Sequence, residues 1–380
     1  MEEEFLRESV EAFAELDDPR GQKGRQHKLV DIMCIALVAV LAGADNFCEI
    51  EEFGKAKEGW LRRYLDLPGG IPSHDTFNRV FSLLNPSKWQ AFFLGWVRQA
   101  ITGKLNGEHI AIDGKEMNGS GQGDYEKVIQ VSAMAVHRGI SLAQLSVDEK
   151  SNEIRVLPSM IETLDLFDLS GCLVSIDAIG TQREVARMLH ERKCRYIQAL
   201  KDNQPKLAEE VRWLFEDAKQ HQTIEVASAQ THDKAHGREE TRRCHLISEV
   251  DFLKTHAWPG LQAVAMVESS RTLKDKTSLD QRYFLLNHTP TPSELLTDVR
   301  AHWGIENGLH WILDVVFLED HHTLSKDHAP QNFNILRQLA LNLIKLDPSK
   351  GSIKAKRKRA AWNLSFLESL LANLQPSLLA

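Results

Sequence analysis

The chain has 380 residues, of which 42% are hydrophobic and 26% are charged, and its formal net charge is −7. This apolar content is large enough to offset the entropy of chain ordering, which excludes collagen-like, low-complexity and wholly disordered proteins. The length predicts two or three domains. The five cysteines include no C-x-x-C pair, which argues against a disulfide framework and a cysteine zinc site and indicates a reducing cytoplasm.

Residues 1–105 have the pattern of a helical domain. Apolar side chains recur at helical spacing, and the pattern is broken by proline and glycine at residues 68–70 and by Asn85-Pro86. The most apolar run, residues 29–44, is shorter than the ~20 residues that a membrane-spanning helix needs. We therefore expect a buried helix there and no membrane partner.

Residues 106–212 change to the pattern of a mixed sheet. The predicted strands are 109–113, 128–137, 140–147, 172–176 and 196–200, and the predicted helices are 153–167 and 181–192. This order, β-β-β-α-β-α-β, predicts hairpins first and right-handed parallel crossovers afterwards. The expected fold class is therefore α+β or mixed α/β.

The rest of the chain divides into three further parts. Residues 213–288 are charged and contain short strand-like pieces, which we interpret as a β-rich insertion. Residues 289–346 predict two helices, from 293 towards 317 and from 331 to 345. Residues 347–380 are interpreted as a basic C-terminal tail, because residues 350–359 hold six basic side chains and no acidic one.

Two aspartates follow predicted strands. Asp113 ends the first strand, and Asp177 ends the apolar strand 64 residues later. Taken alone, each is more often a capping or solvated residue. If the first and fourth strands are adjacent and parallel, however, the two carboxylates meet at one edge of the sheet, where they repel each other unless a cation neutralises them. The pair therefore indicates a divalent metal site.

A third carboxylate, Glu306, lies in the predicted helix that starts at residue 293. At about 100° per residue it shares a face with Leu309 and Leu313, so its side chain is expected to point into a largely apolar interior. The alternative to metal binding is a buried glutamate that is hydrogen-bonded to His302 or His310. These histidines lack the H-E-x-x-H spacing of zinc helices, so oxygen ligands and Mg²⁺ or Mn²⁺ are favoured.

Eight short segments are distributed over nearly the whole chain. They read GIPSHDTFNRVF at 70–81, IDGK at 112–115, EKSNEI at 149–154, SIDAIGTQ at 175–182, ALKDNQ at 199–204, HGRE at 236–239, HWGIEN at 302–307 and LHWILDV at 309–315. Together these segments resemble the DDE transposases of bacterial insertion sequences, specifically the H-repeat-associated group.

The resemblance implies an RNase H-like catalytic core in which Asp113, Asp177 and Glu306 form the catalytic and metal-binding triad, with a β-rich insertion before the glutamate helix. The implied function is that of a DNA transposase, a polynucleotidyl transferase that cleaves DNA at element ends and transfers the strand. The implied cofactors are Mg²⁺ or Mn²⁺, with two ions at the site. The implied partners are double-stranded DNA, from element ends and target, and a second copy of the chain on paired ends.

Basic residues at four places are candidates for contacts with DNA phosphates, and solvated side chains are the alternative for each. Lys115 follows the first aspartate by two residues, and Lys201 ends the fifth strand at the same edge of the sheet. The helical domain, a candidate for recognising the element ends, contributes Arg62, Arg63 and Arg79. The predicted tail contributes Lys354, Lys356, Arg357, Lys358 and Arg359.

Two other functions stay open at this point. One is an RNase H-like nuclease that cuts DNA without joining it, and the other is a catalytically silent DNA-binding relic. The sequence also departs from the group: residues 116–120 read EMNGS where an arginine is frequent. A related signature upstream of the glutamate has tyrosine and arginine where Val299 and His302 stand here.

Overall fold

The computed structural model describes residues 11–23, 25–101, 105, 107–117, 128–148, 153–221, 224–235, 238–273, 276–321, 324 and 326–374. Three parts of the sequence motifs, residues 118–120, 149–152 and 236–237, lie outside the described residues. Within the described ranges, no helix is both long and apolar enough to span a membrane.

Helices form the N-terminal region, as the sequence predicts. They are η1 (Ala12–Glu15), α2 (Leu29–Leu41), α3 (Phe47–Leu61), α4 (His74–Leu83) and α5 (Pro86–Ala100). Helix α2 is buried along almost its whole length, because its sequence is apolar except for Asp31. The carboxylate of Asp31 accepts a hydrogen bond from the backbone N–H of Leu67 at 3.2 Å, which satisfies this acidic group inside the helical layer.

Among the residues that the structure describes, nine strands form one sheet in the order β3-β2-β1-β4-β5-β9-β8-β7-β6. The first five are β1 (His109–Met117), β2 (Val128–Ala135), β3 (Ile140–Asp148), β4 (Leu173–Ile176) and β5 (Arg195–Leu200). Strand β1 pairs antiparallel with β2 and parallel with β4, and β4 pairs parallel with β5. The predicted adjacency of the first and fourth strands is therefore confirmed, and these five strands have the order and directions of an RNase H-like core.

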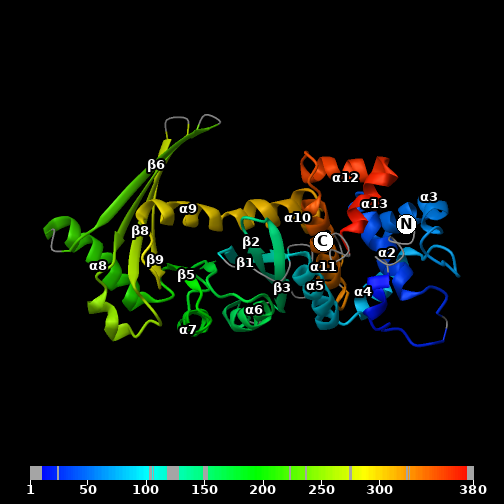
Figure 1. The fold of residues 1–380 in the computed structure, drawn as a ribbon, viewed down its shortest axis with the longest axis horizontal. Helices are drawn as coiled ribbons and strands as arrows, with labels where there is room; N and C mark the ends of the chain where they lie inside the picture. Colours follow the sequence, from blue (N-terminus) through cyan, green and yellow to red (C-terminus); the bar gives the residue numbers. More distant parts are fainter. Residues whose placement is uncertain are drawn as a thin grey trace.

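Helices cover both faces of this core (Figure 1). On one face lie α6 (Leu157–Leu164), with the short η2 (Glu153–Arg155) before it and η3 (Asp165–Phe167) after it, and α7 (Arg183–Glu191). On the other face lie α9 (Pro292–His302), the π-helical turn η5 (Glu306–His310), α10 (Trp311–Val315) and η6 (Glu319–His321). The predicted single helix from 293 to 317 is thus an α-helical rod with a π turn inside it.

The β-rich insertion extends the same sheet. It contains α8 (Pro205–His221), β6 (Ala227–Ala235), β7 (Arg238–Ile247), η4 (Asp251–His256), β8 (Ala263–Leu273) and β9 (Lys276–Leu286). Strand β9 pairs antiparallel with β5, which joins the insertion to the core. The short predicted pieces underestimate these strands, because stretches such as residues 276–281 of β9 are exposed and lack the alternation that marks a half-buried strand. They also miss β8, although its residues 263–267 are apolar and mostly buried.

The C-terminal region differs from the predicted basic tail, because most of it is folded into helices. Helix α11 (Ala329–Leu346) is followed by α12 (Ile353–Trp362) and α13 (Leu364–Ala372), which pack against α11 and α2. Helix α11 also contacts α4, α5 and β3. One hydrophobic core therefore joins the N-terminal helices, the sheet and the C-terminal helices.

Candidate active site

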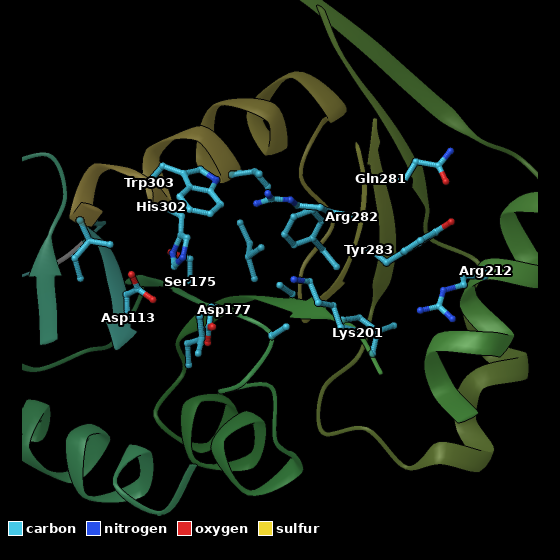
Figure 2. A pocket seen from close by; sticks show the side chains of 18 of the residues that line it. Asp113, Ser175, Asp177, Lys201, Arg212, Gln281, Arg282, Tyr283, His302 and Trp303 are labelled. Atoms are coloured by element: carbon cyan, nitrogen blue, oxygen red, sulfur yellow. The ribbon is translucent and has the colours of Figure 1, made fainter. Parts of the chain in front are cut away.

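The parallel pair β1 and β4 brings Asp113 and Asp177 to the same edge of the sheet. Ile112 lies opposite Ile176 in the register, so the two aspartates follow at equivalent positions. Strand β1 continues past Asp113 to Met117, whereas Asp177 comes directly after β4 and accepts a hydrogen bond from the N–H of Gly180 at 3.1 Å. Both carboxylates line a cavity of about 480 Å³ between β4, β5, β9 and α9 (Figure 2).

Glu306 begins the π turn, and its side chain is 53% exposed. The prediction that it points into an apolar interior is wrong, because the wider π turn separates Glu306 from the buried face that carries Leu309 and Leu313. Gly304 lies close to the sheet: a Cβ atom there would be 3.2 Å from Val136 Cγ1. The glycine thus lets the rod approach the sheet just past β2, where Val136 lies beside His109 at the start of β1.

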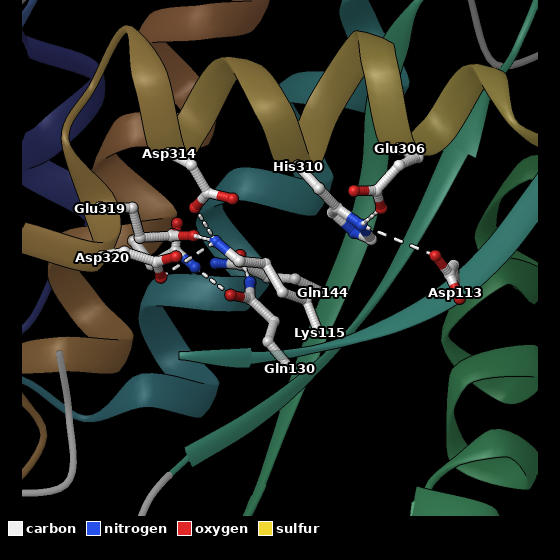
Figure 3. Close-up of polar contacts among 10 residues, drawn as sticks. Asp113, Lys115, Gln130, Gln144, Glu306, His310, Asp314, Glu319 and Asp320 are labelled. Carbon is white, nitrogen blue, oxygen red and sulfur yellow. Dashed lines mark hydrogen bonds and ion pairs between the residues drawn. The ribbon is translucent and has the colours of Figure 1, made fainter. Parts of the chain in front are cut away.

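His310 holds two of the carboxylates together (Figure 3). Its Nδ1 lies 3.1 Å from Glu306 Oε2 and 3.6 Å from Asp113 Oδ2, and its side chain is buried. One ligand atom from each of Asp113, Glu306 and His310 lies within 4.8 Å of the other two. Of the two histidines considered beside Glu306, His310 is the one that bonds it, while His302 Nδ1 lies 2.8 Å from Ser175 Oγ.

The electrostatics of this group favour a bound cation. Burial raises the pKa of Asp113 to about 6; His310 opposes this shift, and the negative charges of Asp177 and Glu306 add to it. The hydrogen bond from His310 lowers the pKa of Glu306. Carboxylates that are partly desolvated and close together are costly to ionise without a counterion. Because carboxylate oxygens are the ligands that Mg²⁺ and Mn²⁺ prefer, these residues fit such an ion.

A chain of polar side chains lies beneath the carboxylates. His109 Nε2 is 2.7 Å from Ser175 Oγ, which in turn contacts His302. Burial lowers the pKa of His109 to about 3 and that of His302 to about 4, so both imidazoles are neutral at pH 7. They therefore orient β4 and α9 through hydrogen bonds and not through charge.

We expect the protein to lose stability on mild acidification because of these two histidines. Between pH 6.5 and about 4 the unfolded chain binds protons at both positions and the folded chain does not, so the free energy of unfolding falls by roughly 1.4 kcal/mol per pH unit per histidine. Urea unfolding at pH 7 and pH 5 measures this slope. His109→Gln and His302→Asn should flatten it, and His221→Gln, which changes an exposed histidine, should not; equal slopes in all four proteins would contradict the assignment.

The predicted DNA contacts fall into exposed and enclosed residues. Lys201 is exposed and lines the cavity beside Asp177. Arg62, Arg63 and Arg79 are exposed on or after α3 and α4; Arg62 is paired with Glu58 at 2.7 Å, and Arg63 lies 3.6 Å from Glu368. These side chains stay candidates for phosphate contacts.

The predicted basic tail needs a residue-by-residue correction. Lys354 and Lys358 are exposed on α12, and Arg359 is partly exposed over the ring of Phe366. Lys356 and Arg357, in contrast, are buried, and they form ion pairs with Asp347 at 2.9 Å and Asp45 at 2.8 Å. Their positive charges are compensated inside the fold, so these two side chains are not available to DNA.

The cavity also contains Arg282 and Tyr283, which sequence reasoning did not select and which reach it from β9. Trp303, on the predicted glutamate helix, reaches the cavity from the residue after α9 (Figure 2). The guanidinium of Arg282 lies over the Trp303 ring, 4.8 Å from its centroid. No local signal in the sequence indicates this meeting, because it depends on the long-range pairing of β9 with β5.

Comparison with known proteins agrees with this geometry. Residues 10–97 match the family model described as DDE_Tnp_1-associated, and residues 104–343 match the Transposase DDE domain. The chain belongs to the DDE transposases. The matched range contains Asp113, Asp177 and Glu306, and the predicted family and DNA transposase function are confirmed.

Relatives of this transposase match it along nearly its full length. The "Putative transposase YncI" of Escherichia coli O157:H7 is 36% identical over 371 residues, which cover 94% of this chain and 93% of that protein. The "H repeat-associated putative transposase YhhI" of Escherichia coli (strain K12) is 32% identical, over 97% of this chain and 98% of that protein. A solved piggyBac transposase synaptic complex with hairpin DNA matches with a TM-score of 0.45 and 10% identity, over 96% of this chain and 77% of that chain.

Proposed function

We propose that this transposase cuts DNA at the ends of its insertion sequence and joins the released 3′ end to target DNA, in the bacterial cytoplasm at the nucleoid. The proposal rests on one observation above all. Asp113 and Glu306, which are 193 residues apart in the sequence, face each other across His310, and Asp177 lies at the adjoining strand end. Three carboxylates from separate segments at one sheet edge are the residue set of metal-assisted phosphodiester chemistry.

Each residue of this set has a separate role in the proposal. Asp113, Asp177 and Glu306 would hold two Mg²⁺ or Mn²⁺ ions, which when bound activate water and stabilise the entering and leaving oxygens of the phosphate. Asp113 provides a carboxylate that is mostly shielded from water, and Asp177 is oriented by the N–H of Gly180. His310 keeps Glu306 directed toward Asp113, and Lys201 binds a phosphate oxygen at the mouth of the cavity.

The DNA and protein partners complete the proposal. We assign contacts with element-end phosphates to the exposed residues Arg62, Arg63 and Arg79, and contacts with flanking DNA to Lys354, Lys358 and Arg359. We assign the working assembly to two copies of the chain on paired ends, because two ends must be joined together. We also assign the binding of element ends to residues 1–105, the helical part that the sequence predicts for this role.

Incubation of the full-length protein with Mg²⁺ or Mn²⁺, a duplex that carries its own element end, and a target plasmid tests this function. Sequencing of the products maps both cuts and junctions. Cuts at the element boundary together with end-to-target junctions are the expected result. Cuts without junctions would show that the protein is a nuclease that cuts DNA without joining it. DNA binding without any cut would show that it is a catalytically silent DNA-binding relic.

A further inference from the structure

Lys115 is placed to act on the same site from within the protein. It follows Asp113 by two residues on β1, so both side chains leave the same face of the strand. That face is covered by the rod that carries Glu306. The side chain of Lys115 is only 14% exposed.

The ammonium group of Lys115 meets three carboxylates of the segment that follows Glu306 (Figure 3). It forms an ion pair with Asp314 of α10, lies 2.6 Å from Glu319 Oε2, and lies 3.4 Å from Asp320 Oδ1. Two of its N–H donors form hydrogen bonds to Asp314 and Glu319, and Asp320 adds a third negative charge beside them. The ammonium of Lys115 is therefore directed to the rod, whereas that of Lys201 is exposed.

These ion pairs lie in a partly buried place, where an unpaired charge has a high cost in free energy. Glu319 is only 1% exposed, and the side chain of Asp314 is 26% exposed. The ammonium of Lys115 lies against both of these carboxylates and compensates their charge. Without the ammonium, the three carboxylates would repel one another, and the ion pairs that hold α10 and η6 to β1 would be lost.

We propose that Lys115 is a positioning residue that fixes the glutamate-bearing rod against β1 and so sets the distance between Asp113 and Glu306. Asp113 and Lys115 are rigidly linked by one strand, and Glu306 and Asp314 are linked by one continuous helical segment. A fixed Lys115–Asp314 contact therefore fixes the carboxylate pair. The inference rests on the proposed function, since it assigns what Lys115 does for the same site.

Three measurements on Lys115→Met and Lys115→Arg test this inference. The first is hydrogen exchange of residues 306–316 in the DNA-free protein, the second is the Mn²⁺ concentration that half-saturates binding and cleavage, and the third is the salt dependence of DNA affinity. Lys201→Met is the matched control, because it removes an exposed lysine at the same site. Lys115→Met/Glu319→Gln removes opposite charges together and serves if Lys115→Met alone fails to fold.

For Lys115→Met we expect faster exchange in residues 306–316, a half-saturating Mn²⁺ concentration about tenfold higher, and cleavage about 100-fold slower, since misplacement by about 1 Å and loss of supporting contacts have effects of this size. The slope of log affinity against log salt should stay the same, whereas Lys201→Met should lower it by about one. Lys115→Arg should recover part of the Mn²⁺ affinity, because it keeps the charge.

The opposite pattern would overturn the inference. Unchanged exchange and unchanged Mn²⁺ dependence, with a salt slope reduced by about one, would make Lys115 a phosphate contact. A wild-type protein that neither binds Mn²⁺ nor cleaves DNA would reject the proposed function instead. In that case the exchange comparison between wild type and Lys115→Met still decides whether Lys115 fixes the rod, because it needs neither metal nor DNA.

Discussion

Replacing Glu306 by glutamine is expected to reduce DNA cleavage by at least about 1000-fold while the fold and the affinity for DNA stay the same. Glutamine keeps the size of the side chain and a hydrogen-bond acceptor for His310, but it removes the negative charge that faces Asp113. The substitution therefore removes a proposed metal ligand but does not disturb packing, since the Glu306 side chain is half exposed. Gel analysis of cleavage in Mg²⁺ and in Mn²⁺, together with a DNA-binding titration, measures both quantities.

Glu162→Gln, at an exposed glutamate on α6, is the matched control and should cleave like the wild type. Thermal unfolding of both variants verifies that the folds are equal. Cleavage by Glu306→Gln at a rate close to that of the wild type would remove Glu306 from the triad. A parallel loss of DNA affinity would instead show that Glu306 acts in binding and not in the chemical step.

Replacing Arg357 by methionine is expected to lower the free energy of unfolding by about 3–5 kcal/mol, the usual cost of breaking a buried ion pair from one side. The guanidinium donates to Val40 O at 3.0 Å, pairs with Asp45 at 2.8 Å, and lies 4.2 Å from the centre of the Phe317 ring. Methionine fills part of the space but leaves the carboxylate and the carbonyls without these donors. Urea unfolding followed by circular dichroism measures the change.

Lys354→Met provides the comparison on the same helix, because Lys354 is exposed and should change stability by no more than about 0.5 kcal/mol. The DNA affinities of both variants complete the test. If Arg357→Met were as stable as the wild type and bound DNA more weakly, the basic-tail interpretation would hold for Arg357 after all. The same reasoning applies to truncation after Asp347, which removes α12 and α13 and is expected to unfold the protein.

The sequence predicts the part of the site that depends on strand order. Asp113 and Asp177 follow apolar runs that read clearly as strands, and a single assumption, that the first and fourth strands are adjacent and parallel, brings them together. The β-β-β-α-β-α-β order makes that assumption a natural one. Glu306 is a candidate because of its place in the predicted helix, and the family resemblance then groups it with the two aspartates as a triad.

Other features depend on contacts between distant segments and were therefore predicted incorrectly or not at all. The exposure of Glu306 follows from a π turn, which a fixed rotation of 100° per residue cannot represent. Lys115 and Arg357 read as phosphate-binding residues because their partners, such as Asp314 and Asp45, are far away in the sequence. A positive charge in a sequence gives no sign of whether an acidic residue will meet it in the fold.

The rod from α9 to α10 is attached on both sides of its π turn. In the last turn of α9, Arg300 pairs with Asp233 of β6 at 2.7 Å; just past the end of α10, Arg357 of α12 lies over Phe317. Between these anchors, Gly304 and the π turn are the segment with the least regular helical hydrogen bonding. A relative movement of the insertion and the C-terminal helices must therefore be taken up mainly there, as bending or twisting. Bending there would move Glu306 relative to Asp113, and the ion pair between Lys115 and Asp314 limits this movement by holding the end of the rod to β1.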